Sequence, residues 1–571
     1  MIQLSRDDGV VRVSADTYCL TWAADRPFVA FADAAGHPLA ELFTLSSVHS
    51  TLGQDDTTRI GVWQADSAGE KITLTLDAAS SIWDAKRYTF ECFPDRWRYS
   101  VTVQGRGALT DAHYFGGYYS GHLRWGSGFF RSGQHFLEGF NPEPNSAEVT
   151  GFAAAGCSTI DLMGVPLPGR ADWFFTPPPF CYALRGPGGW LGIGVEAPPG
   201  ENRFTAYHYH GSAGAFHLTL AYEGHTPVEG TYTLPAIGFD LAPSPYEALA
   251  CHRAALIRHR CAPSIPGGPQ PTWWREPIFC GWGAQCYAAS RDKGRAPDYA
   301  RQDFYEDLLS TLVQRGIQPG TVVLDDKWQR TYGENRVDPD KWPDLAGFIQ
   351  RQHEAGRRVL LWLKAWDPEG LPAEACVTNA AGMPVAADPT SPLYERLLRE
   401  SVRLMLDDYG ADGFKVDFTA RIPSGPGLRR HGAAWGLELM KAYLGILHGE
   451  ARQVKPDALI MTHTPHPYLA DVVDMIRLND INMGADVNRA MRHRAQVAAL
   501  ACPGAPIDTD NWPMPDLATW RAYVPLQPEL GVPALYFATH IDSTGEALTE
   551  DDYRLIRETW AAYRLKLREQ A

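Results

Sequence analysis

The first 240 residues alternate between apolar and polar side chains in short runs that are separated by Gly, Pro, Asp and Asn. Examples of such runs are Val10–Ser14, Lys71–Leu76, Trp97–Val103 and Phe216–Tyr222. A period of two is typical of strands with one buried face, because successive strand side chains point to opposite sides of a sheet. Many short strands with turn residues between them predict an all-β sandwich domain over residues 1–240.

A helix and a linker are expected next. Ser244–Glu247 combines an N-cap serine, a proline at the first helical position and a glutamate that closes a capping box. This helix is expected to run to Arg260. Residues 262–271 are rich in Pro and Gly, which cannot continue a helix. We therefore expect residues 241–271 to be a linking helix and a linker between two domains.

After the linker, short apolar runs alternate with amphipathic stretches, which is typical of parallel β/α architecture. The expected strands are Ile278–Trp282, Thr321–Leu324, Arg358–Leu363, Gly413–Phe418, Ala458–Thr462, Met475–Leu478, Ala505–Ile507 and Pro533–Phe537. Helical candidates between them include Asp303–Arg315, Leu345–Ala355, Pro392–Tyr409, Trp435–Gln453 and Asp551–Lys566. Eight such units predict a (β/α)8 TIM barrel as the catalytic domain, residues 272–571, in an α/β chain. A doubly wound open sheet is the alternative, although no Gly-rich phosphate-binding sequence follows the first strand.

Composition narrows the function classes. The formal charge of -15 argues against nucleic acid or an anionic membrane surface as a main partner. The 10 cysteines form no CxxC pair, which is typical of reduced thiols in a cytoplasmic protein. Residues 1–8 lack the basic and apolar regions of a signal peptide, and no apolar run approaches the about 20 residues that span a bilayer. We expect a cytoplasmic protein, with a homo-oligomer as the expected assembly.

Polar side chains gather where the barrel strands end, and in a barrel those carboxyl ends carry the chemistry. They include Trp282, Asp325, Asp326, Trp362, Lys364, Lys415, Asp417, His463, His466, Arg477, Asp480, Asp508, Asp510, His540 and Asp542. A purely stabilising role predicts apolar or capping residues at these positions. We therefore expect a functional site at this face. Two aromatic segments of the first domain, His113–Tyr119 and Asp172–Phe175, are either core or walls of a sugar pocket, and the 18 Trp of the chain also suit a protein that stacks on sugar rings.

Several chemistries lose support at once. The sequence holds no GxSxG, GxxxxGK[ST] or HExxH motif, so serine hydrolases, P-loop proteins and zincins are disfavoured. A metal-dependent barrel hydrolase stays open as an alternative. However, the first strand offers no His ligands, and His463 and His466 alone are too few for a convincing metal site. We expect neither a metal nor a cofactor.

Two carboxylates that face each other across a sugar need no metal. One attacks the anomeric carbon, and the other protonates the leaving oxygen and later activates water. Asp417 lies on a strand two residues after Lys415, and that cation would keep it ionised. Asp480 follows the mostly apolar Met475–Leu478, which suits a carboxyl with a raised pKa. Asp474 and Asp486 are weaker candidates because they lie before that strand and farther beyond it.

The barrel half resembles the glycoside hydrolase clan of families 27, 31 and 36, with family 36 as the nearest pattern. Residues 323–329, Val-Leu-Asp-Asp-Lys-Trp-Gln, resemble the "LDDGW" motif of the second strand. Trp342–Leu345 and Gly356–Trp362 follow in the expected order, Phe414–Asp417 resembles the "KxD" nucleophile strand, and Arg477–Ile481 resembles the acid/base segment.

That resemblance implies residue roles. Asp417 would be the nucleophile and Asp480 the acid/base. Asp325 and Asp326 would hold the outer hydroxyls of the sugar, Lys415 a hydroxyl near the nucleophile, and Arg477 the 2-hydroxyl. Trp362 would be part of the pocket wall. Lys364, His463 and Trp282 complete the expected substrate-binding set.

The sequence also departs from family 36. Lys327 replaces the usual glycine, strand three continues as Leu363–Trp366 where the family is acidic, and residues 462–467 replace a glycine-rich Cys loop. These departures affect the substrate more than the catalysis. The sequence therefore predicts a retaining exo-glycoside hydrolase for small α-glycosides, most simply α-galactosides. An α-glucosidase, a transglycosylase, or an enzyme for an acidic or sulfonated sugar bound by Lys364, Arg477 and the two histidines are alternatives, as is a carbohydrate-binding barrel without catalysis.

Overall fold

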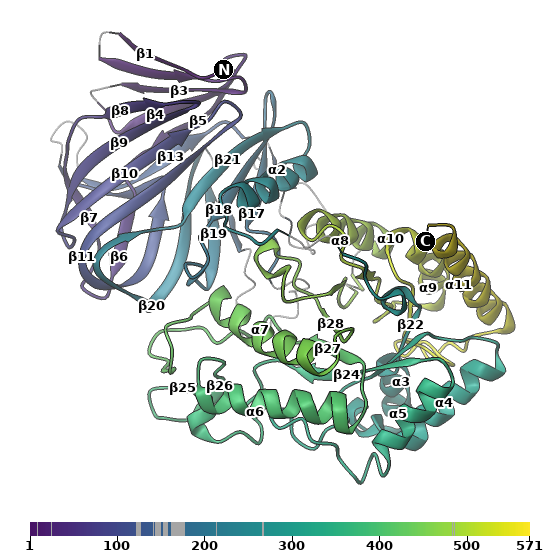
Figure 1. Ribbon diagram of the computed structural model, residues 1–571. Helices are drawn as coiled ribbons and strands as arrows, with labels where there is room; N and C mark the ends of the chain where they lie inside the picture. Colours follow the sequence, from purple (N-terminus) through teal and green to yellow (C-terminus); the bar gives the residue numbers. More distant parts are fainter. Residues whose placement is uncertain are drawn as a thin grey trace.

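The structure is a computed structural model of residues 1–571, and it describes all of them except 8, 24, 25, 122–126, 137, 141, 143–149, 152–157, 162–176, 213, 265–267, 482, 485 and 571. Within the described residues it has a β-rich N-terminal half and a parallel barrel in the C-terminal half (Figure 1). The expected order of a β-sandwich domain followed by a (β/α)8 barrel is confirmed. The expected boundaries at residues 240 and 271 stay predictions.

The N-terminal half is built of mostly antiparallel strands that hydrogen-bond into one continuous, strongly curled sheet (Figure 1). Its strands are β1 (Gln3–Asp7), β2 (Val10–Ser14), β3 (Tyr18–Ala23), β4 (Phe28–Asp33), β5 (Pro38–Phe43), β6 (Ser47–Ser50), β7 (Asp56–Ile60), β8 (Gln64–Ala68), β9 (Lys71–Ser80), β10 (Ala85–Cys92), β11 (Arg96–Tyr114), β12 (Gly116–Tyr119), β13 (Gly128–Gln134), β14 (Glu138–Phe140), β15 (Thr150–Gly151), β16 (Ser158–Asp161), β17 (Cys181–Gly186), β18 (Gly189–Glu196), β19 (Ala206–Ser212), β20 (Ala215–Thr233) and β21 (Ala236–Ala242).

Alternation along these strands places the large apolar side chains inside the curled sheet. The long strand β11 pairs with β10, β20 and β21, and its Trp97 stacks on Phe239 of β21 with ring centroids 3.8 Å apart. Tyr114 and Phe115 are fully buried in this core. The aromatic segment 113–119 therefore belongs mainly to strands β11 and β12 and to the core, whereas residues 172–175 lie outside the described residues.

Helix α2 (Pro245–Arg258) follows, and its capping is as the sequence predicts. The Ser244 side chain accepts a hydrogen bond from the backbone N–H of Glu247, and Pro245 occupies the first turn. The helix packs on β17, β18 and β21 of the first half and on α8 (Val487–Ala501) of the second. It therefore joins the two halves physically as well as along the chain.

The second half contains a closed parallel barrel. Its strands are β22 (Ile278–Cys280), β23 (Thr321–Leu324), β24 (Arg358–Lys364), β27 (Gly413–Asp417), β28 (Leu459–Thr462), β29 (Met475–Arg477), β30 (Ile507–Asp508) and β31 (Ala534–Leu535). They pair in chain order, β31 pairs with β22, and a parallel bridge between Asp508 and Val532 closes the ring. Closure rules out the doubly wound open sheet.

Helices surround the barrel (Figure 1), and most of them lie between successive strands along the chain. They are α3 (Trp282–Asp292), α4 (Gln302–Gln314), α5 (Leu345–Glu354), α6 (Pro392–Arg403), α7 (Leu437–Val454), α8, α9 (Leu517–Tyr523), α10 (Gln527–Leu530) and α11 (Glu550–Gln570). Short elements complete the chain: the hairpin β25 (Cys376–Thr378) and β26 (Pro384–Ala387), a π-helical turn at Leu404–Asp408, and 3-10 turns at Thr272–Arg275, Ala296–Tyr299, Ala373–Ala375, Pro467–Leu469 and Val524–Leu526.

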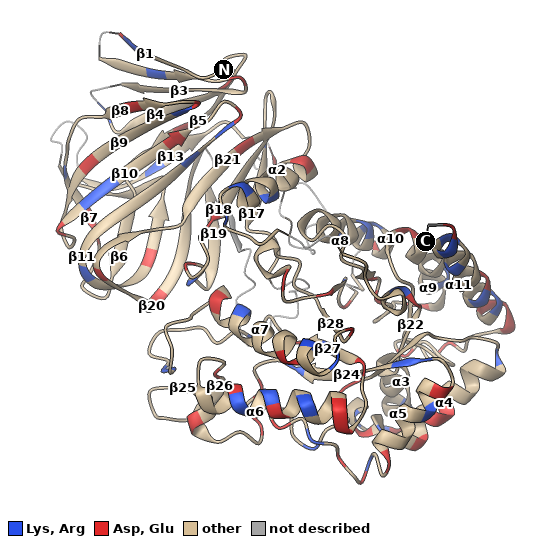
Figure 2. Ribbon diagram, in the orientation of Figure 1, with Lys and Arg blue, Asp and Glu red and all other residues tan. Residues whose placement is uncertain are grey.

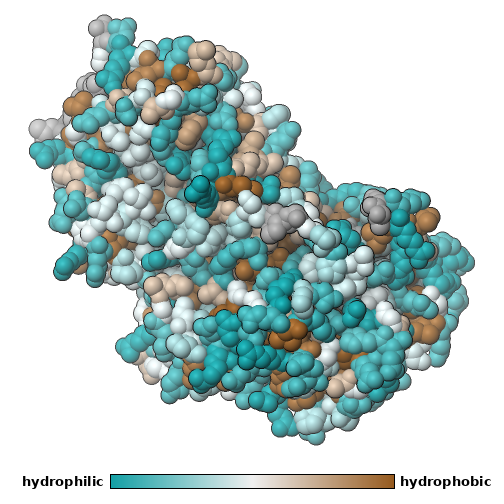
Figure 3. Space-filling view, in the orientation of Figure 1, coloured by the Kyte–Doolittle hydropathy of each residue, from teal (hydrophilic) through white to brown (hydrophobic). Residues whose placement is uncertain are grey.

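Local sequence explains where several helices start. The side chains of Asp344, Ser391 and Asp486 accept backbone N–H groups in the first turns of α5, α6 and α8. The outer helices carry charges of both signs, and α6 shows blue and red bands along its length (Figure 2). The visible surface is mostly hydrophilic with small separate apolar patches (Figure 3), as expected when helices bury only one stripe against the barrel.

Three details differ from the sequence prediction. The first barrel strand ends at Cys280, so Trp282 begins α3 instead of ending a strand. The helix predicted for residues 392–409 is α-helical only to Arg403, and a π-helical turn follows. Helices α3, α8 and α9 belong to the expected strand–helix units but were not among the helical candidates named from the sequence. None of the described helices is long and apolar enough to cross a membrane.

The first half also holds the loop that follows β27. His225 contacts the carbonyl oxygen of Gly425 at 2.9 Å through Nε2, and its Nδ1 lies 3.0 Å from Arg430 Nη1. The His225 ring lies 3.8 Å from the Trp435 ring, and the indole N–H of Trp435 donates to Glu223 at 3.2 Å. The β-domain thus fixes the segment between β27 and α7.

Candidate active site

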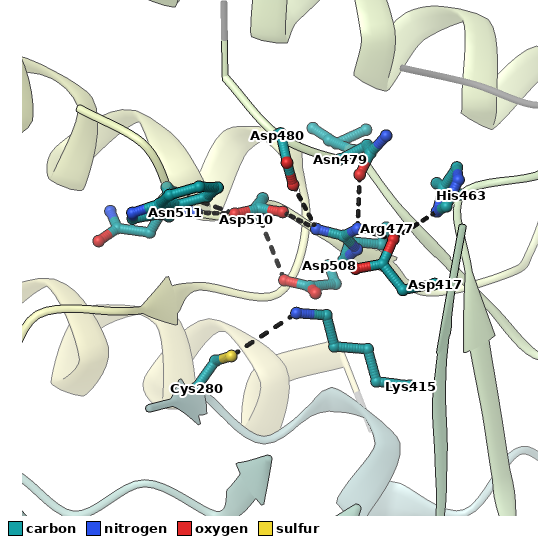
Figure 4. A network of polar contacts seen from close by, with 12 residues as sticks. Cys280, Lys415, Asp417, His463, Arg477, Asn479, Asp480, Asp508, Asp510 and Asn511 are labelled. Carbon is teal, nitrogen blue, oxygen red and sulfur yellow. Dashed lines mark hydrogen bonds and ion pairs between the residues drawn. The ribbon is translucent and has the colours of Figure 1, made fainter. Parts of the chain in front are cut away.

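The carboxyl ends of the barrel strands bring an ionic network together, drawn in Figure 4. Lys415 and Asp417 come from β27, His463 from the end of β28, Arg477 from β29, and Asp508 from β30. Asp480 and Asp510 stand on the loops just after β29 and β30. Parallel strands of a closed barrel end on one rim, so residues far apart in sequence meet there.

Lys415 makes its ion pair with Asp325 and not with Asp417, although its charge does help to lower the pKa of Asp417. Its Nζ lies 2.7 Å from Asp325 Oδ2, and the thiol of Cys280 donates to the same oxygen at 3.0 Å. All three groups are buried. The charge of Asp325 raises the pKa of Lys415 above its ordinary value, against the effect of burial. Lys415 and Asp325 are therefore a buried ion pair one layer below Asp417.

Arg477 is the cation that contacts Asp417. Its Nη2 lies 3.1 Å from Asp417 Oδ1, where the backbone N–H of Phe418 also donates at 2.9 Å. The indole N–H of Trp362 donates to the other oxygen, Oδ2, at 3.2 Å. Burial alone would raise the pKa of Asp417, but the charges of Arg477, His463 and Lys415 and the backbone N–H hold it well below the usual range. Asp417 is thus an ionised carboxylate whose side chain is still 20% exposed.

The same guanidinium also contacts Asp480. Arg477 Nη1 lies 3.2 Å from Asp480 Oδ1, and the Asp480 side chain is 47% exposed. Partial burial raises the pKa of Asp480 to about 6, with the charges of Asp417 and Asp510 adding to the rise and Arg477 opposing it. One cation therefore lies between two reachable carboxyls whose pKa values are displaced in opposite directions, which is the usual mark of an acid and a base with separate roles.

The loop that carries Asp480 is held from behind by α8. Arg494 Nη1 donates to the carbonyl oxygens of Leu478, Asn479 and Asp480 at 3.0, 3.0 and 2.8 Å. Asn479 has a φ of +62°, which turns the chain sharply after β29. The side chain of Asp480 is thereby directed back toward Arg477 (Figure 4).

A second part of the barrel rim lies around Asp326. The Tyr332 hydroxyl donates to Asp326 Oδ1 at 2.8 Å, and burial raises the pKa of Asp326 to about 6. Lys364 lies opposite Asp417 in the register of β24 and β27, and its ammonium lies 4.2 Å from the Tyr332 ring and 5.5 Å from the Phe418 ring. Lys364 also pairs with Asp367 at 2.7 Å. Asp326 and Lys364 therefore lie on the part of the rim formed by β23, β24 and β27.

The two histidines have different environments. His463 is buried with Nδ1 3.7 Å from Asp417 Oδ1 and Nε2 3.0 Å from Thr419 Oγ1, and burial lowers its pKa to about 3. His466 instead caps the turn at 467–469 and lies 4.4 Å from the Phe180 ring of the β-domain. His466 is therefore a packing residue between the halves, and only His463 joins the network.

Trp282 packs edge-on against Trp512 with ring centroids 5.8 Å apart, and the indole N–H of Trp512 donates to Asp542 at 2.9 Å.

Asp508 and Asp510 were noted at the end of the seventh strand but not assigned a role. Asp510 Oδ2 contacts Arg477 Nη1 at 2.5 Å, while burial and the charge of Asp510 raise the pKa of Asp508 to about 7. Their place two residues apart after a strand was the only sequence signal for them.

Comparisons with known proteins support the fold. No family model matches the sequence, and no curated protein matches it. A family GH31 sulfoquinovosidase from E. rectale, solved with an aza-sugar inhibitor, superposes with a TM-score of 0.59 at 9% identity, covering 99% of this chain and 83% of that one. The α-galactosidase of Lactobacillus brevis has a TM-score of 0.54 at 12% identity, with 97% and 83% covered. The α-galactosidase of Thermus thermophilus, in complex with stachyose, has a TM-score of 0.52 at 15% identity, with 87% and 99% covered.

No group of three or more His, Cys, Asp or Glu with the geometry of a metal site occurs among the described residues. The described part of the rim therefore includes carboxyls, the buried cations Lys415 and Arg477, the less buried Lys364, a neutral histidine and aromatic rings. Such a set can hold polyhydroxylated ligands, transfer protons and supply a carboxylate nucleophile.

Proposed function

We propose that this protein is a retaining, exo-acting glycoside hydrolase for terminal α-glycosides, with α-galactosides as the first candidates. One observation carries the proposal: a single guanidinium, that of Arg477, contacts Asp417 and Asp480, and these two carboxyls have pKa values displaced in opposite directions. Double displacement needs one carboxylate that stays ionised and one carboxyl that can carry a proton. The likeness in fold to glycosidases is consistent with this chemistry.

In the first step Asp417 attacks the anomeric carbon and forms a carbon–oxygen bond to it. The bond between that carbon and the leaving oxygen breaks, and Asp480 gives its proton to the leaving oxygen. In the second step the Asp480 carboxylate takes a proton from water, the water oxygen bonds to the anomeric carbon, and Asp417 is released as a carboxylate. Asp480 ends the cycle protonated, as it began.

The surrounding residues have roles that follow from their contacts. Trp362 and the Phe418 N–H donate to Asp417 and hold its two oxygens in place. Asp326 and Lys364 lie on the rim and suit the outer hydroxyls of a sugar. Asp325 and Lys415 are too buried to be simple sugar ligands, so we assign them to support of the floor of the site.

A second candidate is an anionic sugar, such as a sulfonated one. Lys364 and Arg421 approach the ring of Phe418, the residue after Asp417, at 5.5 and 4.4 Å. A negatively charged substituent near Phe418 would meet both cations. The sulfoquinovosidase of similar fold acts on such a sugar, which makes it worth testing. Four residues were first considered for this role, but His466 packs against Phe180 and Arg477 is paired with carboxylates such as Asp510.

The decisive experiment is covalent trapping. The protein is incubated with 2-fluoro-α-galactosyl fluoride, and with the glucosyl and sulfoquinovosyl analogues, and peptides are analysed by mass spectrometry. An adduct on Asp417 is expected from one of them, and the reactive sugar identifies the substrate. An Asp417→Ala protein that keeps full hydrolytic activity would overturn the mechanism. Activity that disappears with a chelator would favour a metal-dependent barrel hydrolase, and binding without turnover would favour a carbohydrate-binding barrel.

A further inference from the structure

Asp510 is a buried carboxylate in direct contact with the active-site arginine. Its side chain is 0% exposed. One oxygen, Oδ1, accepts the backbone N–H groups of Asn511 at 2.6 Å and Trp512 at 3.0 Å, so the loop after β30 fixes its orientation. The other oxygen, Oδ2, lies 2.5 Å from Arg477 Nη1. Asp510 is therefore a rigid anchor and not a ligand for substrate.

Among the residues that the structure describes, the Arg477 side chain has four polar partners, and they are of two kinds. Asp417 and Asp480, at 3.1 and 3.2 Å, are partly exposed and are the proposed reacting groups. Asp510 and Asn479, each at 2.5 Å, are buried or nearly so. The two shortest contacts are thus made with groups that do not react. Figure 4 shows Asp510 and Asn479 approaching the guanidinium from different directions.

We infer that Asp510 is a positioning residue that holds the Arg477 guanidinium between Asp417 and Asp480 throughout the proposed reaction. The inference rests on the proposed function. Nη1 is shared by Asp480 and Asp510, so without Asp510 it would be held only by a partly exposed carboxyl that changes its charge during turnover. A guanidinium is planar and donates in fixed directions, so anchoring one edge also fixes the other.

The charge of Asp510 also acts on Arg477 and Asp480. The Asp510 carboxylate lies close to Arg477, Asp480 and Asp508. The titratable groups packed around these residues are Lys415, Asp417, Asp325, His463, Cys280, Cys286, Tyr523 and Tyr536. Asp510 partly neutralises Arg477 and adds to the negative potential at Asp480. Loss of this charge is therefore expected to make proton release from Asp480 easier.

The test uses Asp510→Asn, which keeps an oxygen acceptor without the charge, and Asp510→Ala, which removes both. Asp510→Ala is expected to lower kcat about 100-fold because the guanidinium is no longer positioned, and Asp510→Asn about 10-fold, with KM little changed in both. In Asp510→Asn the alkaline limb of kcat/KM should move to lower pH. Asn479→Ala removes a neutral partner of the same guanidinium and should leave that limb where it is.

Crystal structures of the two Asp510 variants make the outcome independent of activity. Arg477 should stay between the two carboxyls in Asp510→Asn and leave that position in Asp510→Ala. An Asp510→Ala structure with Arg477 unmoved overturns the inference, and so does a loss of kcat in Asp510→Asn that matches its loss of thermal stability without any movement of the alkaline limb. Failure of the proposed function is a separate result, since it appears as a wild-type protein that forms no adduct on Asp417.

Discussion

Lys415 Nζ lies 2.7 Å from Asp325 Oδ2 and forms a buried ion pair with it, although Asp417 is only two residues away along the same strand. The pair joins β27 to the end of β23 across the barrel interior. Removing one member of a buried pair leaves the other charge without compensation in a medium that solvates it poorly.

Lys415→Met is therefore expected to lower the free energy of unfolding by about 3–5 kcal/mol. The double variant Lys415→Met with Asp325→Asn should recover a large part of that loss, because it leaves no unpaired charge. Urea denaturation followed by tryptophan fluorescence measures both. Lys441→Met, which breaks the more exposed pair with Asp471, is the control and should cost less than about 1 kcal/mol. Equal instability of the single and double Lys415 variants would contradict the prediction.

Trp362→Phe tests the hydrogen bond to the proposed nucleophile. The change keeps an aromatic wall but removes the N–H that donates to Asp417 Oδ2 at 3.2 Å. A hydrogen bond to a charged group contributes about 1.5–3 kcal/mol, so kcat/KM should fall about 10- to 100-fold. Trp366→Phe is the matched control, because its indole N–H donates to the carbonyl oxygen of Thr419 and not to a carboxylate. Equal effects of the two changes would show that packing matters and the hydrogen bond does not.

The pH dependence of activity follows from the two carboxyls. Asp480 must be protonated to act as an acid, so kcat/KM should fall as pH rises through about 6. Asp417 must be ionised, and its pKa lies below the ordinary 3.8, so no acid limb is expected above that pH. The profile of wild type is compared with those of Asp480→Asn and Asp508→Asn on an aryl glycoside with a good leaving group. Only Asp480→Asn should lose the alkaline limb. If the limb disappears in Asp508→Asn instead, the group with a pKa of about 7 is the acid.

A cluster of histidines in the β-domain predicts acid sensitivity of the fold. Burial lowers the pKa of His113 to about 3, of His210 to about 4 and of His217 to about 2, against an ordinary value of 6.5. At pH values between the lowered pKa values and 6.5, the unfolded chain binds more protons than the folded one. These histidines therefore lower the stability as the pH falls below 6.5 and have no effect on it above 6.5. The expected loss is about 1 kcal/mol for each histidine between pH 7.5 and 5.5.

Thermal unfolding at pH 7.5 and 5.5 measures this effect, with His217→Asn as the variant and the exposed His37→Asn as the control. His217→Asn should have a smaller difference between the two pH values than wild type, and His37→Asn the same difference. A pH difference unchanged in His217→Asn would show that other groups cause the acid sensitivity.

Periodicity alone was enough for the architecture. The strand predicted at residues 321–324 is β23 itself, and those at 358–363 and 413–418 differ from β24 and β27 by one residue. The strands β23 and β24 are mostly continuous apolar runs, and β27 alternates Phe414 and Val416 with Lys415 and Asp417, so local pattern and tertiary fold agree. Helices α3 and α8 were not among the named candidates, because small or polar residues such as Ala, Gln, Arg and His make up much of their buried faces and weaken the apolar period. Helix α9 buries Leu517, Trp520 and Tyr523 at helical spacing, but it is only seven residues long.

For the site, the sequence by itself determined that residues such as Lys415, Asp417, Arg477 and Asp480 lie at or just after barrel strand ends, because parallel strands of a barrel end on one rim. It also singled out Asp417 and Asp480, which the structure brings to one guanidinium. Only the tertiary structure decided the partners: Lys415 with Asp325, Arg477 with Asp417, Asp480 and Asp510, and His466 with Phe180. The physical reason is that pairing between charges depends on distances across the barrel, and these are set by strand tilt, loop turns and burial, none of which is carried by the spacing of residues along a single strand.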